Sequence, residues 1–204
     1  GLDRVYNSFV YDFLYPNPES VLAFIENHDT DRFLGEGDNL PMLKQASTLL
    51  LTTRRIPQLY YGTEIMMNGV KSKSDGYVRK DFPGGWADDK ETALTAEGRS
   101  KTQNDCYNFY KTILNWRKGN DVIAKGSMTQ FMVQNGVYAY ARQHEGKTVF
   151  VMLNGTDSAT AVPLKFYKEI LKDAKQGKDI LSGRTITFGE ELKMGARESL
   201  VIEL

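Results

Sequence analysis

Two different patterns of hydrophobic residues divide this chain near Gly119, and this change constrains the fold most strongly. Before it, apolar runs of strand length alternate with segments of helical periodicity, which indicates an α/β arrangement. After it, short apolar runs are separated by the turn sequences QNG and HEG, which are typical of antiparallel hairpins. We therefore predict an α/β domain at residues 1–119 and a β-sandwich domain at residues 120–204.

The first part contains one strand–helix–strand unit. The runs at residues 21–25 and 57–61 are typical of strands that are buried on both faces, and residues 41–53 between them have a helical pattern. This spacing is that of a parallel βαβ unit. We predict a further amphipathic helix at residues 3–14 and a long helix that ends at Gly119.

The charge balance and the single cysteine exclude several classes of partner and site. Lys and Arg number 26 and Asp and Glu also number 26, so we predict no basic surface for nucleic acid or anionic lipid. The apolar runs are far shorter than the roughly 20 residues that cross a bilayer. Cys106 alone cannot form an internal disulfide or a cysteine-rich metal site, and no metal ligands are assigned.

Residues 24–32, with the sequence FIENHDTDR, contain the best candidate site. They follow a predicted parallel strand directly, and active sites of α/β proteins gather at that end of the sheet. The imidazole of His28 and the carboxylate of Asp29 can contact one polar ligand from two sides. Alternatively, this is a polar turn in which Asn27 and Asp29 hydrogen-bond backbone N–H groups. The residues alone leave both interpretations open.

These motifs, in this order, resemble the C-terminal part of α-amylase superfamily glycoside hydrolases. Residues 24–29 resemble the signature at the end of the seventh barrel strand, and residues 56–64 (IPQLYYGTE) resemble the eighth. Residues 107–118 resemble the closing helix of the barrel. Residues 75–86 (DGYVRKDFPGGW) are similar to a loop of the neopullulanase and cyclomaltodextrinase branch. The resemblance implies the C-terminal portion of a (β/α)8 TIM barrel, followed by an antiparallel β-sandwich.

The resemblance also implies roles for individual residues. Asp29 is expected to be the third catalytic carboxylate, which stabilises the transition state, and His28 is expected to donate a hydrogen bond to the same sugar. Asn27 and Arg32 belong to the predicted substrate-binding set, although Arg32 has the alternative role of holding the loop.

Two aromatic residues of the long loop complete the predicted substrate-binding set. Tyr77 and Trp86 can stack on sugar faces, because an aromatic ring offers an apolar face and a polar edge. The alternative is that both rings pin the loop to the rim of the barrel.

The implied function is that of a fragment of a retaining α-glucan hydrolase. Its partner is a starch-derived oligosaccharide with α-1,4 bonds, and α-1,6 bonds are a further option. Such enzymes need a nucleophile and a general acid about 5–5.5 Å apart, and the family carries them on strands four and five. We therefore expect both groups to lie upstream of Gly1 and this chain alone to be inactive. Calcium ligands in the family also lie chiefly upstream, so no cofactor is assigned.

Three other functions stay open: a transglycosylase of the same superfamily, a non-catalytic carbohydrate-binding module, and an amylase-like interaction protein. Two βα units cannot close a barrel, so we expect the missing barrel half or self-association to cover the exposed edge. The chain shows neither a leader nor an initiator Met, so we expect it to be part of a longer protein. The residues leave the location unknown, and only the resemblance points to a periplasmic or extracellular one.

Overall fold

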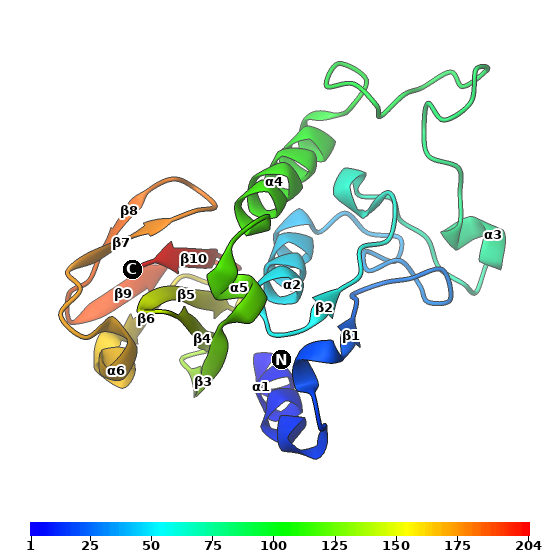
Figure 1. Cartoon of the computed structure of the whole chain (residues 1–204). Coiled ribbons are helices and arrows are strands. Elements are labelled where there is room, and N and C mark those ends of the chain that lie inside the picture. Colours follow the sequence, from blue (N-terminus) through cyan, green and yellow to red (C-terminus); the bar gives the residue numbers. More distant parts are fainter.

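The computed structural model describes all residues from 1 to 204 and separates a helical first part from a strand-rich second part (Figure 1). The first part holds α1 (Leu2–Val10), β1 (Leu22–Ala23), α2 (Leu40–Thr52), β2 (Ile56–Pro57), α3 (Asp75–Val78), α4 (Lys101–Arg117) and α5 (Asp121–Lys125). Single 3-10 turns lie at Tyr11–Leu14, Pro18–Ser20, Thr63–Ile65 and Leu164–Tyr167. The second part holds β3 (Ser127–Gln134), β4 (Val137–His144), β5 (Lys147–Asn154), β6 (Thr160–Pro163), α6 (Lys168–Leu171), β7 (Gln176–Asp179), β8 (Thr185–Thr187), β9 (Glu191–Met194) and β10 (Ser199–Glu203).

The second part is built on a six-stranded sheet in the order β3-β4-β5-β10-β7-β8, in which all neighbouring strands are antiparallel. A second sheet pairs β6 with β9, also antiparallel. Both predicted hairpin turns are present, because Asn135 and Gly136 have φ of 50° and 76°, and Glu145 and Gly146 have 48° and 78°. Two consecutive residues with positive φ give the turn whose twist matches that of the paired strands. The predicted antiparallel β-architecture is confirmed.

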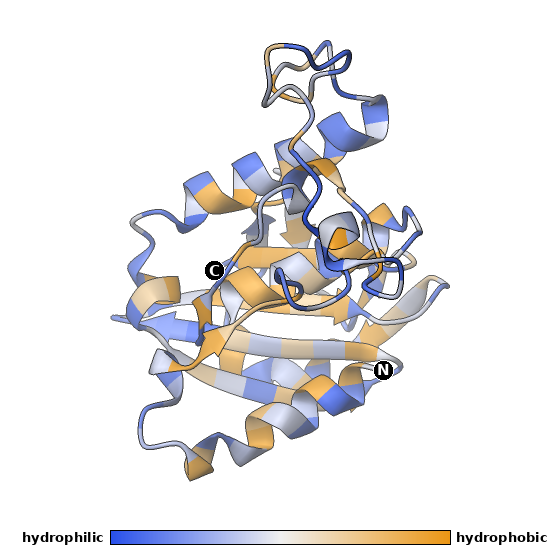
Figure 2. Ribbon diagram, turned by 90° about the vertical axis from the view of Figure 1, so that its right-hand side faces the viewer, coloured by the Kyte–Doolittle hydropathy of each residue, from blue (hydrophilic) through white to orange (hydrophobic).

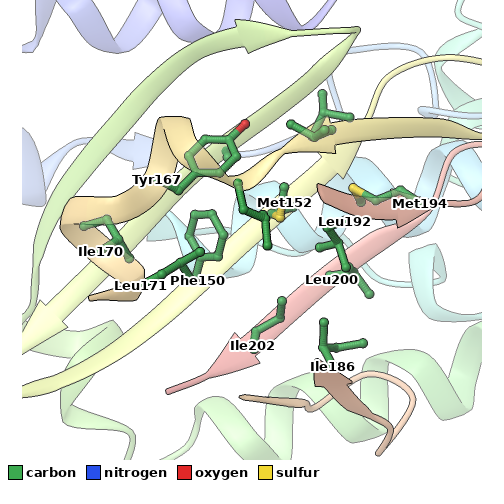
Figure 3. Close-up of a cluster of buried hydrophobic side chains, with 14 of the residues drawn as sticks. Phe150, Met152, Tyr167, Ile170, Leu171, Ile186, Leu192, Met194, Leu200 and Ile202 are labelled. Carbon is green, nitrogen blue, oxygen red and sulfur yellow. The ribbon is translucent and has the colours of Figure 1, made fainter. Parts of the chain in front are cut away.

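Side chains alternate between the two faces of the central strands, so β4 and β5 contribute to two separate cores. One face, drawn in Figure 3, packs Phe150, Met152, Leu200 and Ile202 against side chains from β9 and from the segment that includes Tyr167. Figure 2 shows the same concentration of apolar residues along the strands. This face is closed entirely by elements of the second part of the chain.

The opposite face of the sheet is covered by helices. Tyr138, Tyr140 and Val151 pack there against α5 and against Leu2 and Leu49, which belong to α1 and α2. The two predicted domains therefore share a core, and the boundary between them remains a prediction.

Arg142 of β4 crosses this shared core without a carboxylate partner. Its guanidinium donates from Nη1 to the Thr52 carbonyl at 3.0 Å and from Nη2 to the Ile123 and Gly126 carbonyls at 2.9 and 2.8 Å. These carbonyls lie at the C-terminal ends of α2 and α5, where the helix dipole is negative. Burial lowers the pKa of Arg142 to about 10. The side chain ties the sheet to both helices.

The predicted parallel βαβ unit is present, but its strands are shorter than expected. β1 and β2 pair in parallel, with Leu22 opposite Ile56, and α2 connects them. The side chain of Asn39 caps α2 by accepting from the N–H of Met42 at 3.0 Å. The predicted burial of both strands is wrong, because Leu22 of the first is 54% exposed and Tyr61 of the second is 40% exposed. This sheet has only two strands, so each strand has one edge without a paired strand.

The helices otherwise follow the sequence pattern. α1 continues into a 3-10 turn that ends at Leu14, and α4 ends just before Gly119, whose φ is 76°. A capping box at Ser100 and Gln103 starts α4. None of the helices combines the length and the hydropathy that crossing a membrane requires.

Candidate functional site

The turn that follows β1 presents a histidine and a carboxylate side by side. Asn27 shapes it, because its Oδ1 accepts from the N–H of Asp29 at 2.8 Å and its own N–H donates to Thr30 Oγ1 at 3.0 Å. His28 Nε2 lies 3.2 Å from Asp29 Oδ2, and the two side chains are 60% and 62% exposed. The backbone role considered for Asn27 is confirmed. The carboxylate of Asp29, by contrast, projects outward.

A segment some 45 residues further along the chain holds this turn from the side. Arg79 donates from Nε to the His28 carbonyl at 3.0 Å and from Nη2 to Asp29 Oδ1 at 3.1 Å. The same Nη2 lies 3.2 Å from Asp75 Oδ2. Lys71 Nζ adds a bond of 3.1 Å to the Asp29 carbonyl. The charge of Asp29 is therefore balanced by a guanidinium that also fixes the backbone of the turn.

The sequence reasoning missed Arg79 and Lys71. The available signal was the spacing of Asp75 and Arg79, which are four residues apart and form an ion pair across the short helix α3. This spacing indicates a local helical turn, but it does not indicate which distant turn the arginine contacts.

A buried ion pair supports the turn from below. Glu26 is only 2% exposed, and its carboxylate lies 3.2 Å from Arg32 Nη1. The second oxygen of Glu26 accepts from the N–H of Phe33 at 2.5 Å, and the hydroxyl of Thr63 donates to the first. The two ends of the turn are thus fastened to one carboxylate, which leaves the residues between them exposed.

Arg32 is part of this support and does not reach the surface. Its side chain is fully buried, with Nε donating to the Val78 carbonyl at 3.0 Å and Nη1 to the Tyr61 carbonyl at 2.7 Å. The guanidinium carbon lies 4.0 Å from the ring centroid of Tyr60. Its Nη2 has no partner within the chain. Of the two roles considered for Arg32, the structure favours holding the loop, and a contact of Arg32 with substrate stays a prediction.

Tyr77 and Trp86 lie in different surroundings. Tyr77 belongs to α3 beside Arg79, and Lys80 Nζ and Lys73 Nζ lie 3.8 and 4.6 Å from its ring centroid. Cations thus already occupy positions over this ring. Trp86 is 63% exposed on a loop whose backbone is held by Asp89, with Asp89 Oδ2 accepting from the Trp86 N–H at 3.1 Å. Stacking of either ring on a sugar stays a prediction.

The arrangement is suited to gripping polar groups of a ligand. Asp29 accepts hydrogen bonds and His28 can donate one, so together they can hold neighbouring hydroxyl groups. No group of three His, Cys, Asp or Glu side chains is placed to hold a metal ion. The turn therefore offers an acceptor and a donor on a rigid base.

Known proteins share both the sequence and the fold of the chain. Residues 128–203 match the family described as the cyclo-malto-dextrinase C-terminal domain. An α-amylase of Niallia circulans is 30% identical over 197 residues, which are 93% of this chain and 32% of that protein. A cyclomaltodextrin glucanotransferase of Thermoanaerobacterium thermosulfurigenes is 32% identical over 188 residues, which are 88% of this chain and 24% of that protein. This chain is homologous to the C-terminal region of α-amylases and cyclomaltodextrin glucanotransferases.

The fold of this amylase-related chain also occurs in solved structures. The α-amylase GTA of Geobacillus thermoleovorans, solved in complex with acarbose, superposes with a TM-score of 0.75 at 24% identity. The superposition covers 98% of this chain and 42% of that enzyme. By sequence, this chain spans about a quarter to a third of the length of the α-amylase of Niallia circulans and the glucanotransferase named above.

Proposed function

We propose that this chain is the C-terminal part of an enzyme that cleaves α-glucosidic bonds in starch-derived oligosaccharides, with Asp29 as its third catalytic carboxylate. The observation that carries this proposal is the exposed His28–Asp29 pair, 3.2 Å apart, at the carboxyl end of β1. Parallel strands place active-site loops at this end. The buried Glu26–Arg32 pair beneath it supplies the rigidity that a catalytic position needs.

Strands β1 and β2 are, in this proposal, the seventh and eighth strands of a (β/α)8 barrel, with residues 1–119 forming barrel and residues 120–204 forming the β-sandwich. Their parallel pairing across α2 supports it. So does an apolar groove of about 350 Å³ between α1, β1 and α2, which includes Phe9 and Phe24. The missing barrel half, or a second copy of the chain, would cover this groove.

The contribution of this chain to the reaction is to hold the sugar. Retaining cleavage requires a nucleophile and a general acid about 5–5.5 Å apart, and in the proposal other segments supply both. Asp29 accepts hydrogen bonds from sugar hydroxyls, and these bonds strengthen as the ring distorts toward the oxocarbenium-like state. His28 donates to the same ring. The isolated chain therefore releases no maltose from maltohexaose.

Glucanotransferase activity is the second candidate function, because several of the relatives carry that name. Both reactions use the same carboxylates and differ in whether water or a sugar hydroxyl accepts the glycosyl group. Product analysis separates them, since only transfer yields cyclodextrins or longer oligosaccharides.

An exchange of the key carboxylate tests the proposal in the full-length protein that contains this chain. Asp29→Asn is expected to lower kcat on maltohexaose by about 1,000-fold or more, while the protein stays folded. The matched control is Asp88→Asn, which changes an exposed acid of the long loop and is expected to leave kcat unchanged. Full activity of the Asp29→Asn variant would contradict the proposal.

A further inference from the structure

A second cleft lies where the helical part of the chain meets the six-stranded sheet. It has a volume of about 460 Å³ and is lined by the start of α2, one side of α4, the turn after β7 and the segment at the start of β10. Ligand sites favour such junctions and have volumes of about 300–1,000 Å³. Figure 1 shows α3, beside the candidate site, and the β7–β8 hairpin on opposite sides of the view. None of the residues that line the cleft belongs to the candidate site.

One wall of the cleft is a polar stripe of α4. Asp105, Asn108 and Thr112 occupy positions i, i+3 and i+7 of the helix and therefore share one face. Their side chains form no hydrogen bond or ion pair within the chain, so an acid, an amide and a hydroxyl all remain free for a ligand. The half-buried ring of Phe109 interrupts this stripe with an apolar surface.

The charged side chains of the opposite wall are held by partners within the chain. Arg184 Nη2 lies 2.5 Å from Glu198 Oε1, and Glu198 Oε2 accepts from the Gly195 N–H at 2.7 Å. Arg197 is paired with Asp157 at 2.7 Å. This network pairs both arginines of that wall, and the buried carboxylate of Asp179 accepts from the N–H groups of Ser182 and Val201 at 3.0 and 2.9 Å.

The charged residues of the lining are also balanced in number. The lining holds three cations, Lys44, Arg184 and Arg197, and three acids, Asp105, Asp179 and Glu198. Ser199 lines the same cleft, and its buried Oγ has no hydrogen-bond partner within the chain. A site with many donors and acceptors, an apolar ring and no net charge favours an uncharged polyhydroxyl ligand over a phosphate or a carboxylate.

We propose that this cleft binds α-glucan at a second site, separate from Asp29. The hydroxyls of the sugar bond to Asp105, Asn108 and Thr112, and its apolar face packs on Phe109. The choice of α-glucan as the ligand rests on the proposed function, whereas the site itself rests on the geometry of the cleft. A glucan bound in this cleft stays attached to the protein while another part of the same glucan is cleaved.

Titration of the isotope-labelled 204-residue chain with maltohexaose, followed by NMR, tests this inference. Amide shifts are expected at residues 105–112 of α4 and 182–199 of the opposite wall. The double variant Asn108→Ala/Thr112→Ala is expected to raise the Kd for these shifts about tenfold. Alanine favours helix, so α4 is retained. The matched control, Lys111→Ala, removes an exposed side chain of α4 outside the cleft and is expected to leave the Kd within about twofold.

The arms of the experiment separate this site from the candidate active site. Asp29→Asn is expected to leave the shifts at the cleft unchanged. Shifts confined to residues 26–32 and 71–79 would overturn the second site and leave the proposed function intact. Equal binding of inorganic phosphate at the cleft, or an equal loss of affinity in the Lys111→Ala control, would also overturn it. Loss of activity in the full-length Asp29→Asn variant is measured independently and decides the proposed function alone.

Discussion

The antiparallel six-stranded sheet and the parallel β1–β2 sheet differ in how well their strands are buried. In the six-stranded sheet, residues 137–142 of β4 are buried on both faces, by a second layer on one side and by helices on the other. In the β1–β2 sheet, each strand has two residues and exposes a large apolar side chain. The difference teaches that the sheet of the second part is complete within this chain, whereas the parallel sheet has an unsatisfied edge and an uncovered apolar face.

The largest expected difference in stability is between the alanine variants of two phenylalanines, one from each sheet region. Phe150→Ala leaves a cavity at a fully buried position in the core of the second part of the chain. We expect it to lower the free energy of unfolding by about 3–5 kcal/mol. Phe24→Ala, at a side chain that is 42% exposed, is expected to cost less than about 1 kcal/mol. Urea unfolding followed by circular dichroism measures both. Equal losses would show that the parallel region is as well packed as the sheet.

The next effect separates support from function within the candidate site. Glu26→Gln leaves the guanidinium of Arg32 buried without its counterion and is expected to lower the free energy of unfolding by about 3 kcal/mol. Asp29→Asn changes a side chain that is 62% exposed, so we expect a change within about 0.5 kcal/mol. Urea midpoints at pH 7 test the pair. A large loss in Asp29→Asn would mean that this residue holds the fold, which would weaken its catalytic assignment.

Alkaline pH provides a third contrast, between Cys106 in the helical part and Tyr167 in the core that packs on the six-stranded sheet. Burial raises the pKa of the Cys106 thiol from 9.0 to about 12. At a pH between these two values, the thiol loses its proton in the unfolded chain and keeps it in the folded chain. Stability therefore falls as pH rises, by up to about 1.4 kcal/mol per pH unit for this group. Burial also raises the pKa of Tyr167 to about 12, from an ordinary value of 10.0, so its decline begins one unit later.

Unfolding at a series of pH values from 8 to 12 measures this contrast. In the Cys106→Ala variant, the decline between pH 9 and 10 is expected to disappear, and the decline above pH 10 is expected to remain. An unchanged profile in the variant would contradict the burial of the thiol. Slow reaction of native Cys106 with a thiol reagent at pH 8 is an independent check of the same burial.

The smallest effects concern two glycines with the same backbone conformation, one in each region. Gly119 and Gly136 both have φ of 76°. A Cβ added to Gly119 meets no atom within 4 Å, so Gly119→Ala is expected to cost only the backbone strain of about 1 kcal/mol. At Gly136 the added atom would lie 2.3 Å from Thr156 Cγ2, so Gly136→Ala is expected to cost more. Thermal midpoints rank the two variants, and an equal cost would mean that Thr156 moves aside freely.

Local patterns in the sequence were sufficient for most elements of the fold. The QNG and HEG turns and the end of α4 before Gly119 are each encoded within a few residues, and all are present. The position of the candidate turn after β1 could be predicted for the same reason. An apolar run, however, predicts an apolar environment without saying whether this chain supplies it. The exposure of β1 and β2 was missed on that account.

The surroundings of the site could not be read from local patterns. Arg32 and Asp29 are both polar residues of one short turn, yet Arg32 is fully buried and Asp29 is exposed. The difference depends on Glu26 and on carbonyl groups of residues 61 and 78, which only the tertiary fold brings to Arg32. The contact of Arg79 with Asp29 spans 50 positions and has no periodic signature. Pairings of this kind are set by loop paths and not by residue type.

Arg142 fixes the position of the helices relative to the sheet. α2 starts a few residues after the candidate turn and ends at Thr52, whose carbonyl Arg142 holds from the sheet at 3.0 Å. The end of the helix that is remote from the turn is therefore tied to the sheet, and its middle is tied there too, because Gln45 Nε2 donates to the Asn154 carbonyl at 2.7 Å. The second part of the chain thus fixes the position of α2, the helix that connects the two strands of the parallel sheet.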